Sequence, residues 1–228
     1  MEDKFRSNLA DVHHRIKEAA ARSGRTEDDV KLIAVTKYVD AATTAQLHAA
    51  GAKCLGENRP QMFEEKANEL SHLDIEWHMI GNLQRNKVKR TLMHATLIHA
   101  LDRDSLIDAV AKEAAAQDRT VRCLLEVNVS GESSKHGYSA DEVGAAIERV
   151  ITKPSIRLEG LMCMAGLAGD ADDARREFAL LREIRDSHAN VRTDNVDLRE
   201  LSMGMSGDFE TAIEEGATIV RVGSALYR

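Results

Sequence analysis

The chain has 228 residues, 43% of them hydrophobic and only 4% aromatic, with a formal net charge of −7 and a pI of about 5.7. This length suits one large domain or two small ones, and the aliphatic share is enough for a sizeable buried core. The acidic balance argues against a general nucleic-acid-binding protein, which needs a basic face, but a small anion could still bind in a locally positive pocket.

The sequence carries no recognisable signal for secretion or membrane insertion. Its N-terminus, Met1 to Phe5, is charged and has no apolar run behind it, and no stretch approaches the roughly 18–20 apolar residues of a membrane span. The three cysteines, Cys54, Cys123 and Cys163, are too widely spaced to form a metal-binding pair. We therefore expect reduced thiols, a cytoplasmic location, and neither a membrane nor a nucleic-acid partner.

The first predicted helix covers residues 2–22, where apolar side chains recur at three- and four-residue steps. The first predicted strand follows at residues 30–35. Further helices are predicted at residues 40–50, 60–71, 102–117, 139–151, 170–187 and 206–216, with a polar helix ending near residue 93. Further strands are predicted at residues 53–55, 75–80, 96–100, 121–129, 157–164, 198–203 and 217–222.

Several of these helices have recognisable start signals. Asp40 and Asp102 each precede a helical pattern and can accept hydrogen bonds from its first amides. Ser139 opens a capping box, and Pro60 fits the first turn of its helix. Ser206 is predicted to cap the last of the helices.

The eight strands alternate with helices, which predicts a parallel sheet with helical crossovers. Eight repeats in one domain-sized chain favour a single α/β domain over residues 1–228, a (β/α)8 TIM-type barrel with an extra N-terminal helix. The chain is shorter than the roughly 250 residues typical of this fold. A doubly wound open sheet is the competing fold. We find no internal linker, low-complexity segment or domain boundary.

Two short segments near the C-terminus suggest an anion site. Residues 202–206 (Ser-Met-Gly-Met-Ser) follow the seventh predicted strand, and residues 221–224 (Arg-Val-Gly-Ser) follow the eighth. The loops after these two strands commonly bind phosphate in barrels. Ser206 and Ser224 supply hydroxyl groups, and Gly223 lets the backbone approach a ligand. Each feature alone is common in ordinary turns, but together they favour a phosphate site.

Arg221 has the strand parity of Ile219 and Gly223, which directs its side chain into the barrel. A buried guanidinium needs an acceptor. That acceptor could be a carboxylate, or it could be the ring nitrogen of pyridoxal 5′-phosphate (PLP). Because a guanidinium keeps its proton at neutral pH, a ring nitrogen facing Arg221 would stay unprotonated and would support carbanion chemistry poorly.

In the stretch of residues 32–38 an apolar run ends abruptly in Lys37, at the carboxyl end of the first strand, where barrel active sites are built. In a closed barrel the first and eighth strands are neighbours, so Lys37 and Arg221 would share one site with the phosphate loops. A neutral lysine amine can attach PLP as a Schiff base. Alone, a lysine after a strand is usually a solvated loop residue. Beside these loops, we predict that Lys37 carries PLP.

Other polar residues end predicted strands on the same face. Asn58 follows the second strand, and His78 lies near the end of the third, where it could equally be a hydrogen-bonded core residue. The basic residues between Arg85 and Arg90, together with Lys135, could form a positive rim that controls PLP exchange, although such runs are usually solvated. We predict no metal site, because the histidines and cysteines lack metal-ligand spacing.

Five segments, taken in order, resemble the pyridoxal phosphate homeostasis proteins. They are residues 34–37 (AVTK), 56–59 (GENR), 78–87 (HMIGNLQRNK), 202–206 (SMGMS) and 221–224 (RVGS). Each motif is weak alone, but five in the expected order are highly specific. The resemblance implies a barrel of the alanine-racemase N-terminal type that holds PLP and delivers it to PLP-dependent apoenzymes, with no defined catalytic reaction.

The resemblance also implies roles for individual residues. It places PLP on Lys37, with Arg221 on the ring nitrogen and Asn58 beside the ring. Phosphate contacts are implied around Ser206, Gly223 and Ser224, and lesser pocket positions at His78 and Met203.

Two other functions remain open. A PLP enzyme of the racemase type would act on amino acids, but such racemases carry a second, β-rich domain that supplies a catalytic tyrosine. Only a few residues follow the eighth strand here, and none of Tyr38, Tyr138 and Tyr227 is an obvious second base. A phosphosugar-type barrel enzyme could use the same phosphate loops without PLP. The sequence leaves the recipient apoenzymes and the oligomeric state open, with a monomer as our expectation.

Overall fold

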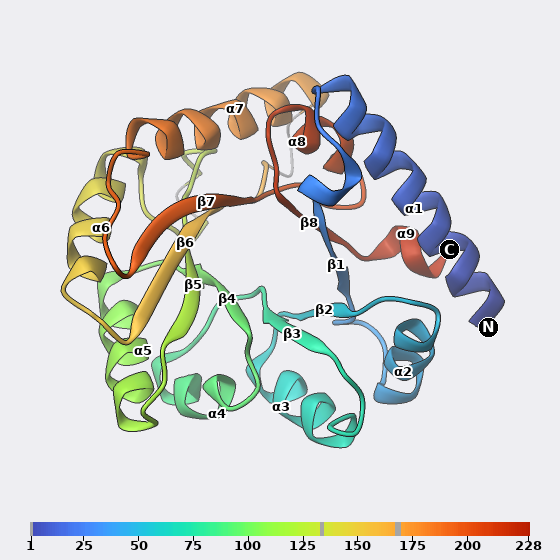
Figure 1. Cartoon of the computed structure of the whole chain (residues 1–228), viewed down its shortest axis with the longest axis horizontal. Helices are drawn as coiled ribbons and strands as arrows, with labels where there is room; N and C mark the ends of the chain where they lie inside the picture. The colour runs from blue at the N-terminus through green and yellow to red at the C-terminus, as the bar shows by residue number, and fades with distance from the viewer. Residues whose placement is uncertain (1, 133–134, 167–169) are drawn as a thin grey trace.

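Short aliphatic runs form eight parallel strands that close into a barrel (Figure 1). The computed structural model describes residues 2–132, 135–166 and 170–228. Each strand pairs with the next along the chain, and β8 pairs with β1, which confirms the predicted TIM-type fold. The strands are β1 (Lys31–Val35), β2 (Cys54–Glu57), β3 (Glu76–Met79), β4 (Leu97–Leu101), β5 (Val121–Glu126), β6 (Ile156–Met162), β7 (Val196–Ser202) and β8 (Ile219–Val222).

Helices surround the barrel (Figure 1). They are α1 (Glu2–Arg22), α2 (Ala41–Ala49), α3 (Pro60–Glu69), α4 (Val88–Leu92), α5 (Asp104–Ala116), α6 (Val143–Ile151), α7 (Ala171–Ser187), α8 (Phe209–Glu214) and α9 (Ser224–Tyr227). Three 3₁₀ turns precede β1, α4 and α6, at η1 (Glu27–Asp29), η2 (Arg85–Lys87) and η3 (Ala140–Glu142). Within the described residues, no helix has the length and apolar character needed to cross a membrane.

The extra N-terminal helix, α1, packs against α8 and α9 beside the seam between β8 and β1 (Figure 1). Its apolar stripe, including Leu9, Val12 and Ile16, is buried as the sequence periodicity predicts. Phe5 meets Tyr227 edge to face, with 5.9 Å between the ring centroids. These contacts hold the two ends of the chain together next to the seam.

The core has two parts, separated by the sheet. The larger part lies between the strands and the helices, and the smaller part lies inside the barrel. Consecutive strand residues alternate between the two parts, so Ile33 faces the interior while Ala34 faces the helices. The apolar interior cluster comprises Ile33, Leu97, Ala100, Leu124, Met162 and Ile219. Buried polar side chains joined by hydrogen bonds also cross the interior: His78, His99, Ser202 and Arg221.

Two of the predicted helix starts are wrong. The helix expected from Ser206 begins at Phe209, because Asp208 occupies the N-cap position and accepts a hydrogen bond from the Met205 amide at 2.5 Å. Ser206 instead lies in the preceding turn. The prediction missed this because the Ser206 hydroxyl pairs with the distant Gly223 amide, which no local pattern reveals.

The helix expected from Asp102 begins at Asp104, with Arg103 at the N-cap position. The Asp102 carboxylate is buried and pairs with Arg103 and with Asn82 of the neighbouring loop. The other start signals are confirmed. Asp40 accepts from the Thr43 amide at 2.8 Å, Ser139 forms its capping box, and Pro60 is the first residue of α3.

The fifth strand also ends earlier than predicted, at Glu126 and not at Val129. The amide of Tyr138 donates to the Glu126 carbonyl at 2.8 Å, and the Asn128 amide donates to the Tyr138 carbonyl at 2.9 Å. The returning loop therefore takes the hydrogen bonds that would extend the strand pairing.

Candidate functional site

A cavity of about 570 Å³ opens at the carboxyl end of the barrel, where the predicted site residues were expected. It is lined by residues at, or just after, the carboxyl ends of β1, β2, β3, β6, β7 and β8. Six of the eight predicted site residues line it: Lys37, Asn58, Ser206, Arg221, Gly223 and Ser224. Residues almost 190 positions apart in the sequence therefore meet in one cavity because the barrel closes between β8 and β1.

Lys37 lies two residues beyond β1 and is partly buried. Its Nζ stands 4.9 Å from the ring centroid of Tyr38, over the aromatic face. Tyr38 is 80% exposed and lines the same cavity, so the Lys37 amine lies beside a solvent-exposed part of the cavity wall. This position suits an amine that reacts with a small molecule entering from outside.

The segment that carries Lys37 is held from below by a buried ion pair. Lys66 of α3 pairs with Glu57, and its Nζ also donates to the Thr36 carbonyl at 2.7 Å. The Thr36 hydroxyl donates to the Glu57 carboxylate at 2.8 Å. Because Glu57 and Lys66 are 0% and 3% exposed, this network fixes the backbone directly before Lys37.

Arg221 reaches the cavity from inside the barrel, as its strand parity predicts. It is 4% exposed, with NH1 donating to the Ser202 hydroxyl oxygen at 2.6 Å and NH2 to the Cys163 carbonyl at 2.8 Å. Burial lowers the pKa of Arg221 from its ordinary value, but a guanidinium stays protonated at neutral pH. Its acceptors are neutral, so its charge remains available to a ligand in the cavity.

The loops after β7 and β8 meet at Ser206. Its Oγ accepts hydrogen bonds from the amides of Gly223 at 3.0 Å and Ala225 at 3.4 Å. Gly204 turns the first loop with a φ of 91°, and a Cβ at this position would lie 2.6 Å from the Ala212 side chain. With its oxygen accepting from these two amides, Ser206 keeps its own O–H for a ligand, and Ser224 adds a second hydroxyl to the cavity lining; hydroxyl donors of this kind suit a phosphate.

Asn58 also lines the cavity. Its Oδ1 is buried and has no hydrogen-bond partner among the described residues. Gly81 packs against it so closely that a Cβ there would lie 2.3 Å from the Asn58 carbonyl oxygen. A buried amide oxygen without a partner is costly, so Asn58 is placed to bind a polar ligand.

His78 and Met203 do not line the cavity. Met203 is fully buried in the core between sheet and helices. His78 is fully buried inside the barrel, where it contacts Glu76 and His99. Their implied places beside a ligand therefore receive no support from this geometry, and only an indirect role is open to His78.

Sequence reasoning missed several lining residues, including Met205 and Tyr227. Tyr227 belongs to α9, which was not predicted, and its hydroxyl donates to the Val35 carbonyl at 3.0 Å. The short segment after Ser224 carried too little periodicity to show that it turns back toward β1.

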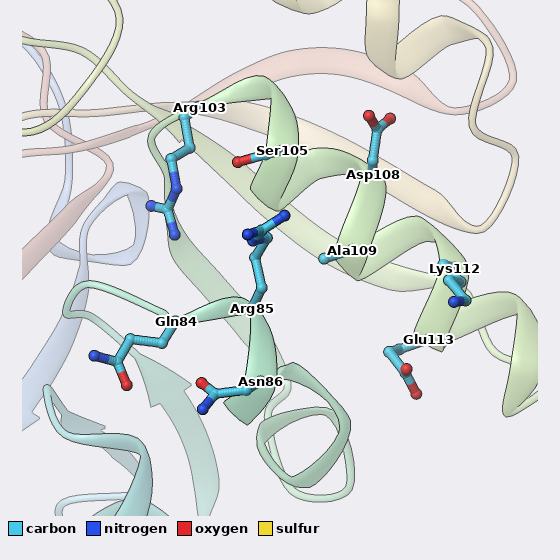
Figure 2. A pocket seen from close by; sticks show the side chains of 9 residues that line it. All are labelled: Gln84, Arg85, Asn86, Arg103, Ser105, Asp108, Ala109, Lys112 and Glu113. Atoms are coloured by element: carbon cyan, nitrogen blue, oxygen red, sulfur yellow. The ribbon is translucent and has the colours of Figure 1, made fainter.

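The basic residues between Arg85 and Arg90 are not among the residues that line the cavity. Arg85 lines an open depression beside α5 together with Arg103, Ser105 and Lys112, outside the barrel mouth (Figure 2). Lys135 is closer to the cavity, because its Nζ donates to the carbonyl of the cavity residue Met164 at 3.4 Å. A role of these residues in PLP exchange stays a prediction. Lys135 is the better placed of them, because it contacts a residue that lines the cavity.

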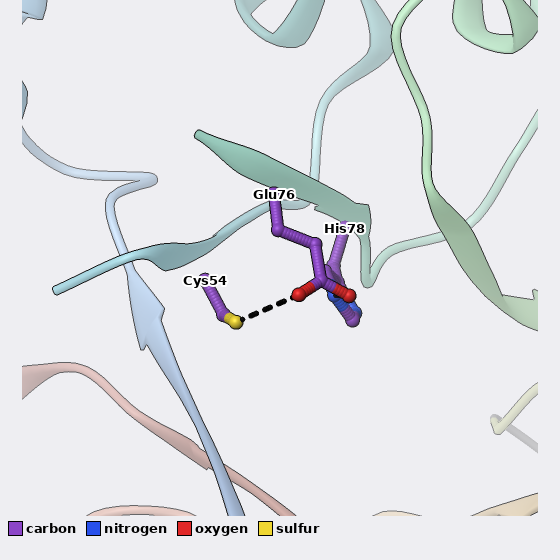
Figure 3. Close-up of side chains that lie close together, drawn as sticks. All are labelled: Cys54, Glu76 and His78. Carbon is purple, nitrogen blue, oxygen red and sulfur yellow. Dashed lines mark hydrogen bonds and ion pairs between the residues drawn. The ribbon is translucent and has the colours of Figure 1, made fainter. Parts of the chain in front are cut away.

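A thiol, a carboxylate and an imidazole come within 4.8 Å of one another at the opposite end of the barrel: Cys54, Glu76 and His78 (Figure 3). The sequence analysis missed this group because it joins two strands, although Glu76 and His78 share one face of β3. The carboxylate already accepts from Cys54 at 3.1 Å, His78 at 3.1 Å and Lys31 at 2.9 Å. Lys31 neutralises the charge that a cation would need, so we assign no metal there.

Glu126, at the carboxyl end of β5, gives a pH prediction. Burial, with a smaller contribution from Asp102, raises the pKa of its carboxyl to about 7. Between pH 4.5 and 7 the folded protein therefore holds a proton that the unfolded chain has lost, so stability falls as the pH rises. Glutamine has no such proton to lose, so Glu126→Gln should not show this fall. Relative to wild type, its free energy of unfolding should rise by up to roughly 3 kcal/mol as the pH is raised from 4.5 to 8.

Urea unfolding of both proteins across this pH range measures the difference. The exposed Glu148 of α6 provides the matched control, and Glu148→Gln should follow the wild-type curve. Parallel curves for Glu126→Gln and wild type would contradict the assignment.

Comparison with known proteins agrees with this geometry. The family model of the alanine racemase N-terminal domain matches residues 7–228. The pyridoxal phosphate homeostasis protein of Aquifex aeolicus is 42% identical over 219 residues, which cover 96% of this chain and 95% of the relative. Its counterpart in Pseudomonas aeruginosa is 39% identical over 220 residues, which cover 96% and 93%.

Solved structures give the same result. PipY of Synechococcus elongatus, in a structure with PLP bound, matches with a TM-score of 0.86 and 30% identity, covering 98% of this chain and all of PipY. An alanine racemase from Streptomyces coelicolor shares the fold with a TM-score of 0.74 at 16% identity, and this chain covers 58% of it.

Fold, cavity and family model together define a barrel of the alanine racemase N-terminal class. Within that class, the near-full-length matches are more specific. The chain belongs to the pyridoxal phosphate homeostasis protein family, which confirms the resemblance seen in the five sequence motifs.

Proposed function

We propose that this protein binds PLP in the barrel-mouth cavity and takes part in intracellular PLP homeostasis, holding the cofactor and releasing it to apoenzymes. The observation that carries the proposal is that Lys37 and Arg221 line one cavity with Ser206, Gly223 and Ser224. This set offers an amine, a fixed cation and a cluster of anion donors within a volume of about 570 Å³. PipY, at 30% identity, has been solved with PLP bound.

The residues present fit the chemical groups of PLP. The hydroxyls of Ser206 and Ser224 would donate to the phosphate beside the Gly223 backbone, and the amides of Gly223 and Ala225 hold the Ser206 oxygen in place. Asn58, whose buried Oδ1 has no partner among the described residues, would bind a polar group of the ring. The Lys37 amine would condense with the aldehyde to give a Schiff base and one water molecule.

Arg221 explains why the proposed role is carriage and not catalysis. PLP supports carbanion chemistry when it acts as an electron sink. Arg221 can only donate hydrogen bonds, so it favours an unprotonated ring nitrogen and weakens that property. The curated relatives carry the name of homeostasis proteins and not of enzymes. We propose that the protein binds and releases PLP with no defined reaction of its own.

An absorption titration tests the proposal. PLP added to the purified protein should give a Schiff-base band near ~420 nm, and borohydride should fix the label on Lys37. A protein that gives no such band and retains no PLP after gel filtration would contradict the proposal. The loaded protein, incubated with single amino-acid enantiomers, should show no racemisation at ordinary enzyme rates. Such turnover would instead favour the racemase-type function.

We further propose a cytoplasmic monomer. The three free cysteines suit a reducing compartment. The exposed large hydrophobic residues are Tyr38, Met62, Met93, Met164 and Leu180. They come from separate segments of the chain, and Tyr38 and Met164 line the cavity, which supports a monomer. Light scattering of the purified protein would measure the mass directly, and transfer to a PLP-dependent apoenzyme in the presence of a PLP trap would test direct delivery.

A further inference from the structure

A chain of hydrogen bonds crosses the barrel interior from Arg221 to Glu76, and we call it the polar chain. Arg221 NH1 donates to Ser202 Oγ at 2.6 Å, and Ser202 Oγ lies 2.8 Å from His99 Nδ1. His99 Nε2 lies 2.9 Å from His78 Nδ1, and His78 Nε2 lies 3.1 Å from a Glu76 carboxylate oxygen. Figure 3 shows the Glu76 and His78 end, at the foot of the barrel.

The polar chain is built from four different strands. Arg221 comes from β8, Ser202 from β7, His99 from β4, and both His78 and Glu76 from β3. Ser202, His99 and His78 are all 0% exposed. Four buried polar groups in a barrel interior carry a desolvation cost, which the hydrogen bonds of the polar chain offset.

The two ends of the polar chain determine the direction of every hydrogen bond in it. Arg221 can only donate, and an ionised Glu76 can only accept. Between them, a neutral serine and two neutral histidines each have one proton to donate and accept one hydrogen bond. The only arrangement that satisfies all four links has Ser202 donating to His99 Nδ1, His99 Nε2–H donating to His78, and His78 Nε2–H donating to Glu76.

The surroundings keep Glu76 ionised and both histidines neutral. The hydrogen bond from His78, followed by those from Cys54 and Lys31, holds the pKa of the Glu76 carboxyl far below its ordinary value. Arg122 adds a second cation 3.9 Å from the same carboxylate. Burial lowers the pKa of His78, and it lowers the pKa of His99 further, with nearby His78 and Arg221 adding to the effect.

We propose that His99, His78 and Glu76 are positioning residues for Arg221: the carboxylate at the foot of the barrel sets both imidazole tautomers and turns a lone pair of Ser202 toward the guanidinium. The polar chain and the Cys163 carbonyl then hold two guanidinium nitrogens and leave the remaining N–H groups for the cavity. The ligand group that this fixed donor recognises is an unprotonated heteroaromatic nitrogen. The inference rests on the proposed function in that it takes the ring of PLP as that ligand.

The first test needs no ligand. In the PLP-free protein labelled with ¹⁵N-histidine, His78 and His99 should both be neutral with the proton on Nε2 at pH 7.5. Glu76→Ala removes the terminal acceptor and should give mixed tautomers at both histidines. Cys54→Ala is the matched control, since it touches the same carboxylate but lies outside the polar chain, and it should leave the tautomers unchanged. An Nδ1–H tautomer for either histidine in the wild-type protein would overturn the inference.

The second test uses PLP itself. Glu76→Ala should bind PLP about ten-fold more weakly and shift its absorption maximum, and Cys54→Ala should match wild type. Ser202→Ala interrupts the polar chain next to Arg221 and changes the side-chain volume little. It should show the same weaker PLP binding and the same shift of the absorption maximum. This second variant keeps the test valid if Glu76→Ala does not fold.

The outcomes of the two proposals are distinct. A wild-type protein that takes up no PLP contradicts the proposed function and the choice of ligand together. A wild-type protein that loads normally, with folded Ser202→Ala or Glu76→Ala showing an unchanged dissociation constant and spectrum, contradicts the positioning role alone.

Discussion

Replacing Lys37 with alanine is expected to abolish covalent attachment of PLP and to weaken its binding about a hundred-fold or more. The variant loses the only lysine amine that lines the cavity, among the residues the structure describes, while the phosphate donors and Arg221 remain. PLP should therefore still bind weakly, with the spectrum of the free aldehyde. Absorption titration and mass spectrometry after borohydride treatment measure both effects.

Lys53→Ala is a suitable control for Lys37→Ala. Lys53 is exposed and directly precedes β2 at the other end of the barrel, so its removal changes the charge equally without touching the cavity. It should load PLP as the wild type does. A persistent Schiff-base band in folded Lys37→Ala would move the attachment to another lysine, and peptide mapping would identify which one.

Replacing Lys66 with methionine is expected to destabilise the protein by about 3–5 kcal/mol, because it leaves the fully buried Glu57 carboxylate without its cation. Thr36 would also lose the hydrogen bond to its carbonyl. Since Thr36 precedes Lys37, weaker PLP loading should accompany the loss of stability. Urea unfolding followed by circular dichroism measures the free energy of unfolding, and the absorption titration measures loading.

The double variant Glu57→Gln/Lys66→Met tests whether the unpaired Glu57 carboxylate causes the loss of stability in Lys66→Met. It removes both charges, so a large part of the stability should return if the unpaired carboxylate is responsible. Arg90→Met breaks an exposed pair with Glu64, in which the arginine is 63% exposed, and should cost less than about 1 kcal/mol. Equal losses in Lys66→Met and Arg90→Met would show that burial of the Glu57 pair contributes nothing.

The polar chain, through Arg221, and Lys37 both act on the same proposed PLP site. A protein that stores PLP has to bind it tightly while suppressing reactions with amino acids. Under the proposed function, Arg221 would meet the second requirement from the ring side and the Lys37 amine the first. The PLP titrations of Ser202→Ala and Lys37→Ala therefore measure separate contributions to one binding site.

The fold was predictable because its signals are local. Strand and helix periodicity, with turn residues between them, identified all eight strands, and a cap such as Asp40 acts on amides within its own first turn. The parity of Arg221 along β8 correctly placed its side chain inside the barrel, because strand residues alternate between two faces. Lys37 could be placed near the cavity because barrel sites lie at the carboxyl ends of strands.

Contacts between individual side chains of different strands were not predictable, because no period in a single sequence encodes which side chains pair with one another inside a barrel. For His78 the sequence left open a place beside a ligand or in the core, and the structure places it in the interior, where it contacts His99 of the neighbouring strand β4. Ser206 was expected to start a helix, but the return of β8 places the Gly223 amide on its hydroxyl. The sequence alone thus determined the elements and the ends of the strands that carry the site. Only barrel closure decided which buried polar groups became hydrogen-bond partners, since each needs a partner and closure determines which ones are within reach.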